Sequence, residues 1–371
     1  MTKSWLSGIA FASALVLSGA AHARVVLGVV GPITGSSAAF GTQLKNGAGQ
    51  AVEDINKAGG ILGQKIKMIL GDDVSDPKQG VSVANDFVGD GVKFVVGDFN
   101  SGVSIPSSNV YEENGIVQVT PASTNPSFTE RGMWNVFRTC GRDDQQGAVA
   151  ADYIFKHFKG KKIAIIDDKT TYGKGLADQV RKDLHAKGVK EVLDEGVNTG
   201  EKDFSAVVSR IKLEGADLVY WGGLQTEGGL IVRQMREQGV NATLMGADGI
   251  ATQEFASIGG PGVVGTLMTY GPDPTKKPQA AKVVQEFAAK KINPEAYTLY
   301  SYAAVQVIQQ AAEKAKSLDP KKVAAMMHSG MTFDTVIGDF SYDKNGDRTD
   351  SDYVVYKWKK QPDGKITYVQ L

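Results

Sequence analysis

The sequence predicts an α/β protein made of two lobes, each built on a doubly wound parallel sheet. The chain has 371 residues, enough for two or three domains at ~150 residues each. Apolar residues make up 42% and charged residues 22%, which is close to the averages of soluble globular proteins. Short apolar runs alternate along the chain with segments of helical period, the pattern of βαβ units around parallel sheets.

The first series of elements lies in residues 25–120. Residues 25–30 are almost all apolar, as expected of a strand that is covered on both faces. Apolar residues then recur along one helix face, at Leu44, Ala48, Ala51, Val52 and Ile55, until a Gly-Gly pair ends the pattern. The same alternation predicts strands at 66–70, 94–96 and 116–120 and helices at 78–88 and 104–113.

A second series of the same kind begins after Arg142. It predicts helices at 145–158, 175–187, 204–213 and 227–238, and strands at 163–167, 192–196, 218–221, 243–246 and 266–270. Three further helical patterns follow at 279–291, 298–316 and 321–328. The end of the chain alternates with period two over 337–342 and 353–358, which predicts a final pair of strands.

The first 23 residues have the pattern of a secretory signal peptide. Lys3 supplies the positive start, residues 9–17 the apolar stretch, and Ala21-His22-Ala23 the cleavage site. The apolar run is well short of the ~20 residues that span a bilayer. We therefore expect export, cleavage after Ala23 and a free protein in the periplasm.

Charge and cysteine content exclude several classes of function. Lys and Arg together number 41, as do Asp and Glu, so the formal net charge is zero and there is no basic excess for nucleic acid. The single cysteine, Cys140, excludes an intrachain disulfide and a cysteine-based zinc cluster.

Motifs for catalysis, cofactors and metals fail in their context. Residues 260–265 match G-x-G-x-x-G, but a helical stretch precedes them and an apolar strand follows, the reverse of a dinucleotide site. Residues 343–347 resemble the start of a calcium loop, but the glycine is fourth rather than sixth. We therefore expect no cofactor, no metal site and no enzymatic activity.

Three loops that follow strands are the places to look for a ligand, because doubly wound sheets bind ligands beyond the carboxyl ends of their strands. The first, 98–106, offers a Ser-Gly pair at a helix start, and the second, 121–126, offers two hydroxyls. The third contains Asp248, which could meet a cation. Donors on one side and a carboxylate on the other match the charges of a free amino acid.

Six segments give the chain a family resemblance. They are Gly-Val-Val-Gly-Pro-Ile-Thr-Gly (28–35), Asp-Ile-Asn-Lys-Ala-Gly-Gly-Ile (54–61), Asp-Pro-Lys-Gln (76–79), Thr-Pro-Ala-Ser-Thr (120–124), Tyr-Gly-Lys-Gly-Leu-Ala (172–177) and Gly-Glu-Lys-Asp-Phe (200–204). With these segments in this order, the chain resembles the periplasmic leucine/isoleucine/valine-binding proteins, the solute-binding proteins of branched-chain amino acid ABC transporters.

The resemblance implies a type I periplasmic binding fold with two lobes joined by three hinge crossovers. We expect residues 24–142 and 272–350 in the N-terminal lobe, and 143–271 and 351–371 in the C-terminal lobe. It also implies a monomer that binds an amino acid in the cleft. The partner would be an inner-membrane ABC permease with its cytoplasmic ATPase.

The resemblance also assigns residues to the cleft. Ser101 and Thr124 match donors to the ligand carboxylate, and the Ala122 carbonyl and Asp248 match acceptors for the ammonium. The expected pocket walls and remaining loop positions are Phe40, Phe99, Asn100, Ser123, Tyr172, Leu224 and Tyr297.

Three departures from the family pattern leave the side-chain preference open. Asp248 stands where close relatives have Glu, Leu224 where branched-chain binders often have Tyr, and Phe40 lacks a hydroxyl. An aliphatic or other apolar amino acid is the favoured ligand. An aromatic carboxylate or a short amide is the alternative, although Asp248 facing such a ligand would carry a desolvation penalty. Two other classes of protein share a two-lobed α/β architecture: enzymes and the ligand-sensing domains of receptors.

Overall fold

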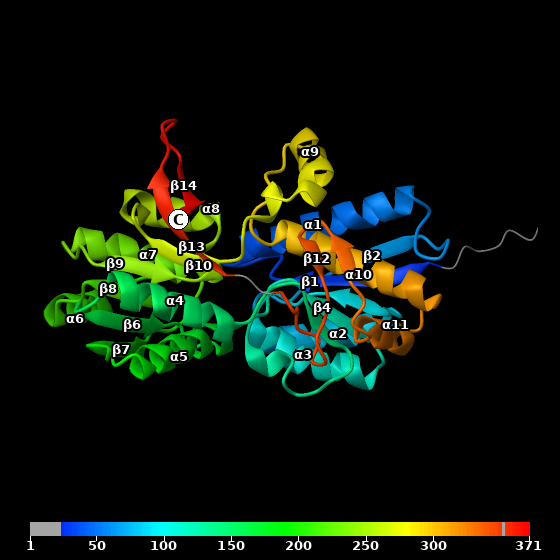
Figure 1. Ribbon diagram of the computed structural model, residues 1–371, viewed down its shortest axis with the longest axis horizontal. Coiled ribbons are helices and arrows are strands. Elements are labelled where there is room, and N and C mark those ends of the chain that lie inside the picture. Colours follow the sequence, from blue (N-terminus) through cyan, green and yellow to red (C-terminus); the bar gives the residue numbers. More distant parts are fainter. Residues whose placement is uncertain (1–23, 351–352) are drawn as a thin grey trace, which may run out of the picture.

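The structure is a computed structural model that describes residues 24–350 and 353–371. Its elements form two lobes that lie side by side, each with a sheet between layers of helices (Figure 1). The predicted signal peptide at 1–23 lies outside the described residues.

The first sheet has five strands, all parallel, in the order β2-β1-β3-β4-β5. The strands are β1 (Val25–Gly31), β2 (Ile66–Asp72), β3 (Phe94–Val96), β4 (Val117–Thr120) and β5 (Val136–Arg138). Successive side chains of β1 point to opposite faces, and both faces are covered: Val29 and Val30 are fully buried but belong to different core clusters.

Helices cover both faces of this sheet. On one face lie α1 (Ala38–Lys57), α10 (Thr298–Ala315) and α11 (Pro320–Met327), and on the other lie α2 (Pro77–Gly89) and α3 (Ser101–Glu113). The helix α10 comes from late in the sequence, yet it packs along α1. The first lobe is therefore assembled from two distant parts of the chain.

The second sheet has seven strands in the order β14-β13-β10-β9-β8-β6-β7. They are β6 (Ile163–Asp167), β7 (Leu193–Gly196), β8 (Leu218–Gly222), β9 (Thr243–Gly246), β10 (Leu267–Tyr270), β13 (Val354–Lys360) and β14 (Ile366–Gln370). The first five are parallel, and β13 and β14 add an antiparallel pair at the edge beside β10.

Five helices flank the second sheet. On one face lie α4 (Asp143–His157) and α5 (Thr171–Ala186), and their apolar residues form one core cluster with the strands. The helices α6 (Ser205–Glu214), α7 (Gln225–Glu237) and α8 (Gln253–Gly259) contribute to another cluster. Short 3₁₀ helices fill the connections: η1 (Pro126–Phe128), η2 (Asp248–Ile250), η3 (Gly260–Val263), η4 (Pro274–Lys276) and η5 (Pro278–Ala280).

The chain passes between the two lobes three times (Figure 1). It crosses after β5, returns after β10, and crosses again between β12 (Gly338–Phe340) and β13. The helix α9 (Ala281–Ala289) lies on the return path. The first and third crossings lie close together, because Arg348 Nη1 donates to the Thr139 carbonyl oxygen at 3.0 Å.

One sequence prediction about the end of the chain is wrong. Residues 337–342 and 353–358 do not pair with each other, since β12 pairs with β11 (Phe333–Thr335) and β13 joins the second sheet. Period-two alternation indicates that one face of a strand is buried, but it carries no information about the partner strand. The segments therefore belong to different lobes.

The structure also contains two strands that the apolar pattern did not predict, and it divides one predicted helix into two. The strand β5 is only three residues long, and β14 is a partly exposed edge strand, so neither has a strong apolar signal. The predicted helix at 279–291 is divided into η5 and α9. Over the residues that the structure describes, no helix combines the length and apolarity needed to cross a membrane.

Candidate functional site

A small cavity lies where loops from both lobes meet at the carboxyl ends of the strands. Its volume is about 10 Å³, and it is lined by Phe99, Asn100, Ser101, Ala122, Tyr172, Leu224, Asp248, Gly249 and Tyr297. All of these except Gly249 are predicted site residues. A cavity of this size has room for about one water molecule, so an amino acid could enter only if the lobes moved apart.

The N-terminal side of the cavity is the start of α3. Asn100 is the N-cap but its side chain makes no capping hydrogen bond, and Ser101 is the first helical residue. Ser101 is buried, and its hydroxyl accepts a hydrogen bond from the Asn125 backbone N–H at 3.3 Å. The first N–H groups of a helix have no partner inside the helix, so this end is suited to an anion.

The second predicted loop is fixed to the first by side-chain hydrogen bonds. The Thr120 hydroxyl donates to the Asp98 carbonyl oxygen at 2.7 Å, and the Ser123 hydroxyl donates to the Phe99 carbonyl oxygen at 3.0 Å. Ser123 and Thr124 are buried but do not line the cavity. The Thr124 hydroxyl has no hydrogen-bond partner among the described residues.

On the opposite side, Asp248 presents a buried carboxylate at the start of η2. Its Oδ1 accepts a hydrogen bond from the Tyr172 hydroxyl at 2.7 Å, and its Oδ2 accepts one from the Tyr297 hydroxyl at 2.9 Å. Burial raises the pKa of Asp248, and these hydroxyls partly offset the shift. No lysine or arginine pairs with this carboxylate among the residues described.

Aromatic rings form the apolar wall. Phe40 and Phe99 are stacked with ring centroids 4.4 Å apart, and Tyr297 meets both rings edge-on at 5.6 Å and 5.0 Å. Phe40 lies behind Phe99 and does not line the cavity itself. Leu224, which is the N-cap of α7, completes the wall on the other side.

The two lobes are hydrogen-bonded across the cleft. Gln225 Nε2 and the Thr226 hydroxyl both donate to the Ser36 carbonyl oxygen, at 3.0 Å and 3.2 Å. Asn125 Nδ2 donates to the Thr171 carbonyl oxygen at 3.0 Å. These polar residues follow strands or begin helices. The expectation that ligands bind beyond the carboxyl ends of strands could therefore have identified them.

Sequence reasoning missed Asp143, the first residue of α4. It is buried, and neither carboxyl oxygen has a hydrogen-bond partner among the described residues. Burial, together with the charge of nearby Asp248, raises the pKa of Asp143 to about 8. The hydroxyl of Tyr220, whose pKa also rises through burial and the charge of Asp143, has no partner in the described structure either. An acidic residue at the start of a helix is ordinarily explained by its favourable interaction with the helix dipole. For this reason the sequence did not indicate Asp143 as a site residue.

The arrangement is suited to holding a small molecule with opposite charges at its two ends. The start of α3 favours an anion, and the carboxylate of Asp248 favours a cation. Within residues 24–350 and 353–371, no group of His, Cys, Asp and Glu side chains is placed to hold a metal ion. The turn at 343–347, which resembles a calcium loop in sequence, uses its acidic side chains within the protein: Asp343 Oδ1 accepts backbone N–H groups and Asp347 contacts two arginines.

Comparison with known proteins agrees with this fold. The family model described as "Periplasmic binding protein" matches residues 24–365. The chain therefore belongs to the periplasmic binding protein family, and its fold is that of the type I members.

Particular relatives are similar over their whole length. The Leu/Ile/Val-binding protein homolog 1 of Brucella suis is 56% identical over 370 residues, covering 100% of both chains. BraC3, a Leu/Ile/Val-binding protein of Rhizobium johnstonii, is 48% identical over 367 residues, or 99% of each. Among solved structures, the leucine-binding protein LivK of Thermotoga maritima has a TM-score of 0.86 at 29% identity, with 93% of this chain and 97% of that one covered.

Proposed function

We propose that this protein is the periplasmic receptor of an ABC importer and binds a free amino acid with an apolar side chain between its lobes. One observation carries the proposal: the start of α3 at Ser101 and the buried carboxylate of Asp248 face the same cavity from opposite lobes. The printed names of the relatives, Leu/Ile/Val-binding proteins, support the same ligand class.

In this proposal the ligand carboxylate binds at the start of α3, with Ser101 and Thr124 as donors. The ammonium binds Asp248 and the Ala122 carbonyl oxygen, and displaces the Tyr297 hydroxyl from one carboxylate oxygen. Charge-assisted hydrogen bonds contribute about 1.5–3 kcal/mol each, and micromolar affinity requires about 8 kcal/mol. A few such bonds are enough.

The apolar side chain of the ligand would lie against Phe99, Tyr297 and Leu224. Tyr172 would close over the ammonium from the C-terminal lobe. Because the cavity is only about 10 Å³, binding must begin with separated lobes and end with hinge closure. Closure removes water from both ligand charges, which strengthens their hydrogen bonds.

The first experiment is native mass spectrometry of the purified protein, followed by thermal shifts with apolar L-amino acids, aromatic carboxylates and short amides. We expect a shift with L-leucine or a similar amino acid. A shift with aromatic carboxylates or amides and none with amino acids would move the ligand to the alternative class, which lacks an ammonium.

The second experiment tests the ammonium site. We expect Asp248→Asn to weaken amino-acid binding about 100-fold by calorimetry, since it removes a charge-assisted contact of up to ~3 kcal/mol. Asp73→Asn is the matched control, because Asp73 is equally buried but does not line the cavity. Equal affinity in Asp248→Asn and the parent would contradict the role of Asp248.

The remaining parts of the proposal concern the protein's place in the cell. Residues 1–23 would direct export and be removed after Ala23, and the loaded monomer would deliver its ligand unaltered to an inner-membrane permease driven by a cytoplasmic ATPase. The lobes would consist of residues 24–142 with 272–350 and 143–271 with 351–371. The intact mass of the exported protein tests the cleavage site, since the mature chain would begin at Arg24.

A further inference from the structure

Arg138, the last residue of β5, is a fully buried arginine that binds the loop between β4 and η1. Its Nη1 donates to the Ser123 carbonyl oxygen at 2.7 Å, and its Nη2 donates to the Asn125 carbonyl oxygen at 3.1 Å. The guanidinium thus holds two backbone carbonyls of residues 121–125, which we name the 121–125 loop. This loop carries the proposed ligand residues Ala122 and Thr124.

The charge of Arg138 is balanced by Asp347, which precedes the third crossing. Arg138 Nε lies 2.6 Å from Asp347 Oδ1, although the N–H is not aligned on that oxygen, so the contact is an ion pair rather than a directional hydrogen bond. Asp347 is almost completely buried. The Thr129 hydroxyl donates to Asp347 Oδ2 at 3.0 Å and accepts from Arg138 Nη2 at 2.8 Å, which ties the pair together.

The turn that carries Asp347 is held against β5. Arg138 N donates to the Gly346 carbonyl oxygen at 3.1 Å. Gly346 has φ +90°, and a Cβ atom there would lie 2.1 Å from the Val136 carbonyl oxygen, so only glycine fits. Asp347 therefore cannot move without moving β5 or breaking these contacts.

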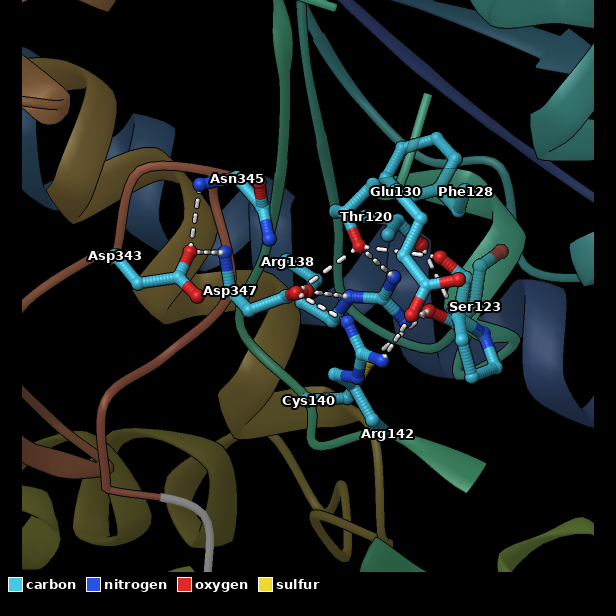
Figure 2. Close-up of polar contacts among 12 residues, drawn as sticks. Thr120, Ser123, Phe128, Glu130, Arg138, Cys140, Arg142, Asp343, Asn345 and Asp347 are labelled. Atoms are coloured by element: carbon cyan, nitrogen blue, oxygen red, sulfur yellow. Dashed lines mark hydrogen bonds and ion pairs between the residues drawn. The ribbon is translucent and has the colours of Figure 1, made fainter. Parts of the chain in front are cut away.

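The second oxygen of Asp347 binds Arg142, which directly precedes the second lobe. Arg142 Nη1 donates to Asp347 Oδ2 at 2.8 Å, and Nη2 donates to Glu130 Oε1 at 2.6 Å and to Asp144 Oδ2 at 2.9 Å. Figure 2 shows the Asp347 carboxylate facing the guanidinium groups of both Arg138 and Arg142, with Glu130 beside the Arg142 guanidinium. Arg142 is the N-cap of α4, and Asp144 lies in the first turn of that helix.

We propose that Arg138, Asp347 and Arg142 form a relay that couples the hinge to the 121–125 loop. This inference rests on the proposed function, since it assumes hinge closure. When α4 turns with the second lobe, Arg142 moves with it and pulls on one oxygen of Asp347. The other oxygen holds Arg138, whose donors position the carbonyls of the loop. Buried charge pairs tolerate little displacement, so the relay favours one hinge angle together with one loop position.

The test uses Arg142→Gln, which breaks the link to α4 and leaves Arg138 paired with Asp347. Arg181→Gln is the matched control. The side chains of Arg142 and Arg181 are 14% and 20% exposed, and each contacts several carboxylates. Arg181, however, lies on α5, and none of its carboxylate partners belongs to the first lobe. Spin labels at Asp90→Cys and Leu213→Cys, both exposed, report the distance between lobes in a Cys140→Ala background.

We expect Arg142→Gln to shift or broaden the interlobe distance distribution without ligand and to raise the dissociation rate of L-leucine on the order of tenfold. Arg181→Gln should change neither the distance distribution nor the dissociation rate, even if it lowers the melting temperature as much as Arg142→Gln does. Arg142→Lys, which keeps the charge, should recover part of the effect. If Arg142→Gln matches Arg181→Gln in both the distance distribution and the dissociation rate, the relay is wrong.

A second variant keeps the test decisive if Arg142→Gln does not fold. Thr129→Val keeps the shape and charge but removes the hydroxyl that joins Arg138 to Asp347, and we expect the same changes at about one third of the size. The interlobe distance is measured without ligand. A failure to bind any apolar L-amino acid would therefore count against the proposed function, while an unchanged distance distribution would count against the relay.

Discussion

At the scale of single residues, Asp143 is a buried acid whose charge is poorly compensated. Burial and the negative charge of nearby Asp248 raise its pKa, and the hydroxyl of Thr124 offsets only part of that shift. Of the cations, Arg138 lowers the pKa of Asp143, but it is already paired with Asp347. Folding therefore favours the protonated form of Asp143.

This predicts a pH dependence with a definite sign. The pKa of Asp143 is about 8 in the folded chain and ~3.9 in an unfolded chain, so the folded state holds a proton that the unfolded state loses between these values. The contribution of Asp143 to stability therefore falls as pH rises from about 4 to 8. We expect Asp143→Asn to raise the melting temperature at pH 8, by at most about 2–4 °C for each kcal/mol of stability gained, with the gain vanishing near pH 4.

The neighbouring acid provides a control of opposite sign. Although burial opposes its ionisation, the Arg142 guanidinium holds the pKa of Asp144 below its usual range. Asp144→Asn should therefore lower the melting temperature at neutral pH, and the loss should shrink as pH falls below ~4. A melting profile of Asp143→Asn that runs parallel to that of the parent across pH 4–8 would contradict the assignment.

Residue positions around the cavity were largely predictable from sequence, because ligand loops follow strands and the family resemblance placed residues within those loops. Phe99, Ser101 and Asp248 line one cavity, as expected of neighbouring site residues. Asp143 was not predictable, since its isolation depends on how Tyr220 and Asp248 pack around it. The roles of the residues around the cavity in ligand binding stay predictions.

At the scale of elements, the contact between α1 and α10 positions part of the aromatic wall. A Cβ atom at Gly47 of α1 would lie 1.9 Å from the carbonyl oxygen of Thr298, the first residue of α10. Tyr297 immediately precedes that residue, and Phe40 lies near the start of α1. The close approach of the helices thus sets the distance between the two rings.

We predict that Gly47→Ala forces the helices apart, at a cost of about 1–3 kcal/mol in the free energy of unfolding, and weakens ligand binding by moving Tyr297. Gly49→Ala is the control on the same helix, because the nearest atom to its Cβ would be 3.7 Å away. That variant should be neutral or up to ~1 kcal/mol more stable. Urea unfolding and calorimetry measure both effects, and equal stabilities of the two variants would contradict the prediction.

The elements themselves were easier to predict than their partners. Buried parallel strands such as β1 are continuous apolar runs, so their existence and type follow from the sequence. The three-residue strand β5 offers too few residues for a pattern, yet it carries Arg138. Pairing of the strands near the end of the chain was predicted wrongly, because it depends on which lobe each strand reaches.

At the scale of the whole molecule, the hydrogen bonds across the cleft stabilise the closed arrangement. Gln225 donates to the Ser36 carbonyl oxygen from α7 and does not line the cavity. A hydrogen bond of this kind contributes about 1 kcal/mol. Since it can form only when the lobes meet, its loss should favour opening and leave the first contacts with the ligand unchanged.

We therefore expect Gln225→Ala to raise the ligand dissociation rate about fivefold, with the association rate nearly unchanged, in stopped-flow measurements. Small-angle scattering should show a smaller fraction of compact molecules. Gln309→Ala, which removes an exposed bond to Glu313 on α10, is the control. An altered association rate with an unaltered dissociation rate would argue against this role for Gln225.

Two lobes were predictable from the repeated βαβ pattern, and three crossings from the family resemblance. The degree of closure was not predictable, because it depends on a few hydrogen bonds between distant residues, such as Ser36 and Gln225, which are 189 positions apart in the sequence.

Cys140 gives the molecule a built-in chemical reporter. It lies in the first crossing, beneath the 121–125 loop, where its thiol contacts the Ser123 carbonyl oxygen at 3.5 Å and burial raises its pKa to about 12. A thiol so protected reacts with an alkylating reagent only when local opening exposes it. Because it is the only cysteine in the sequence, the alkylation rate of the unmodified protein would report local opening around the first crossing, without any engineered label.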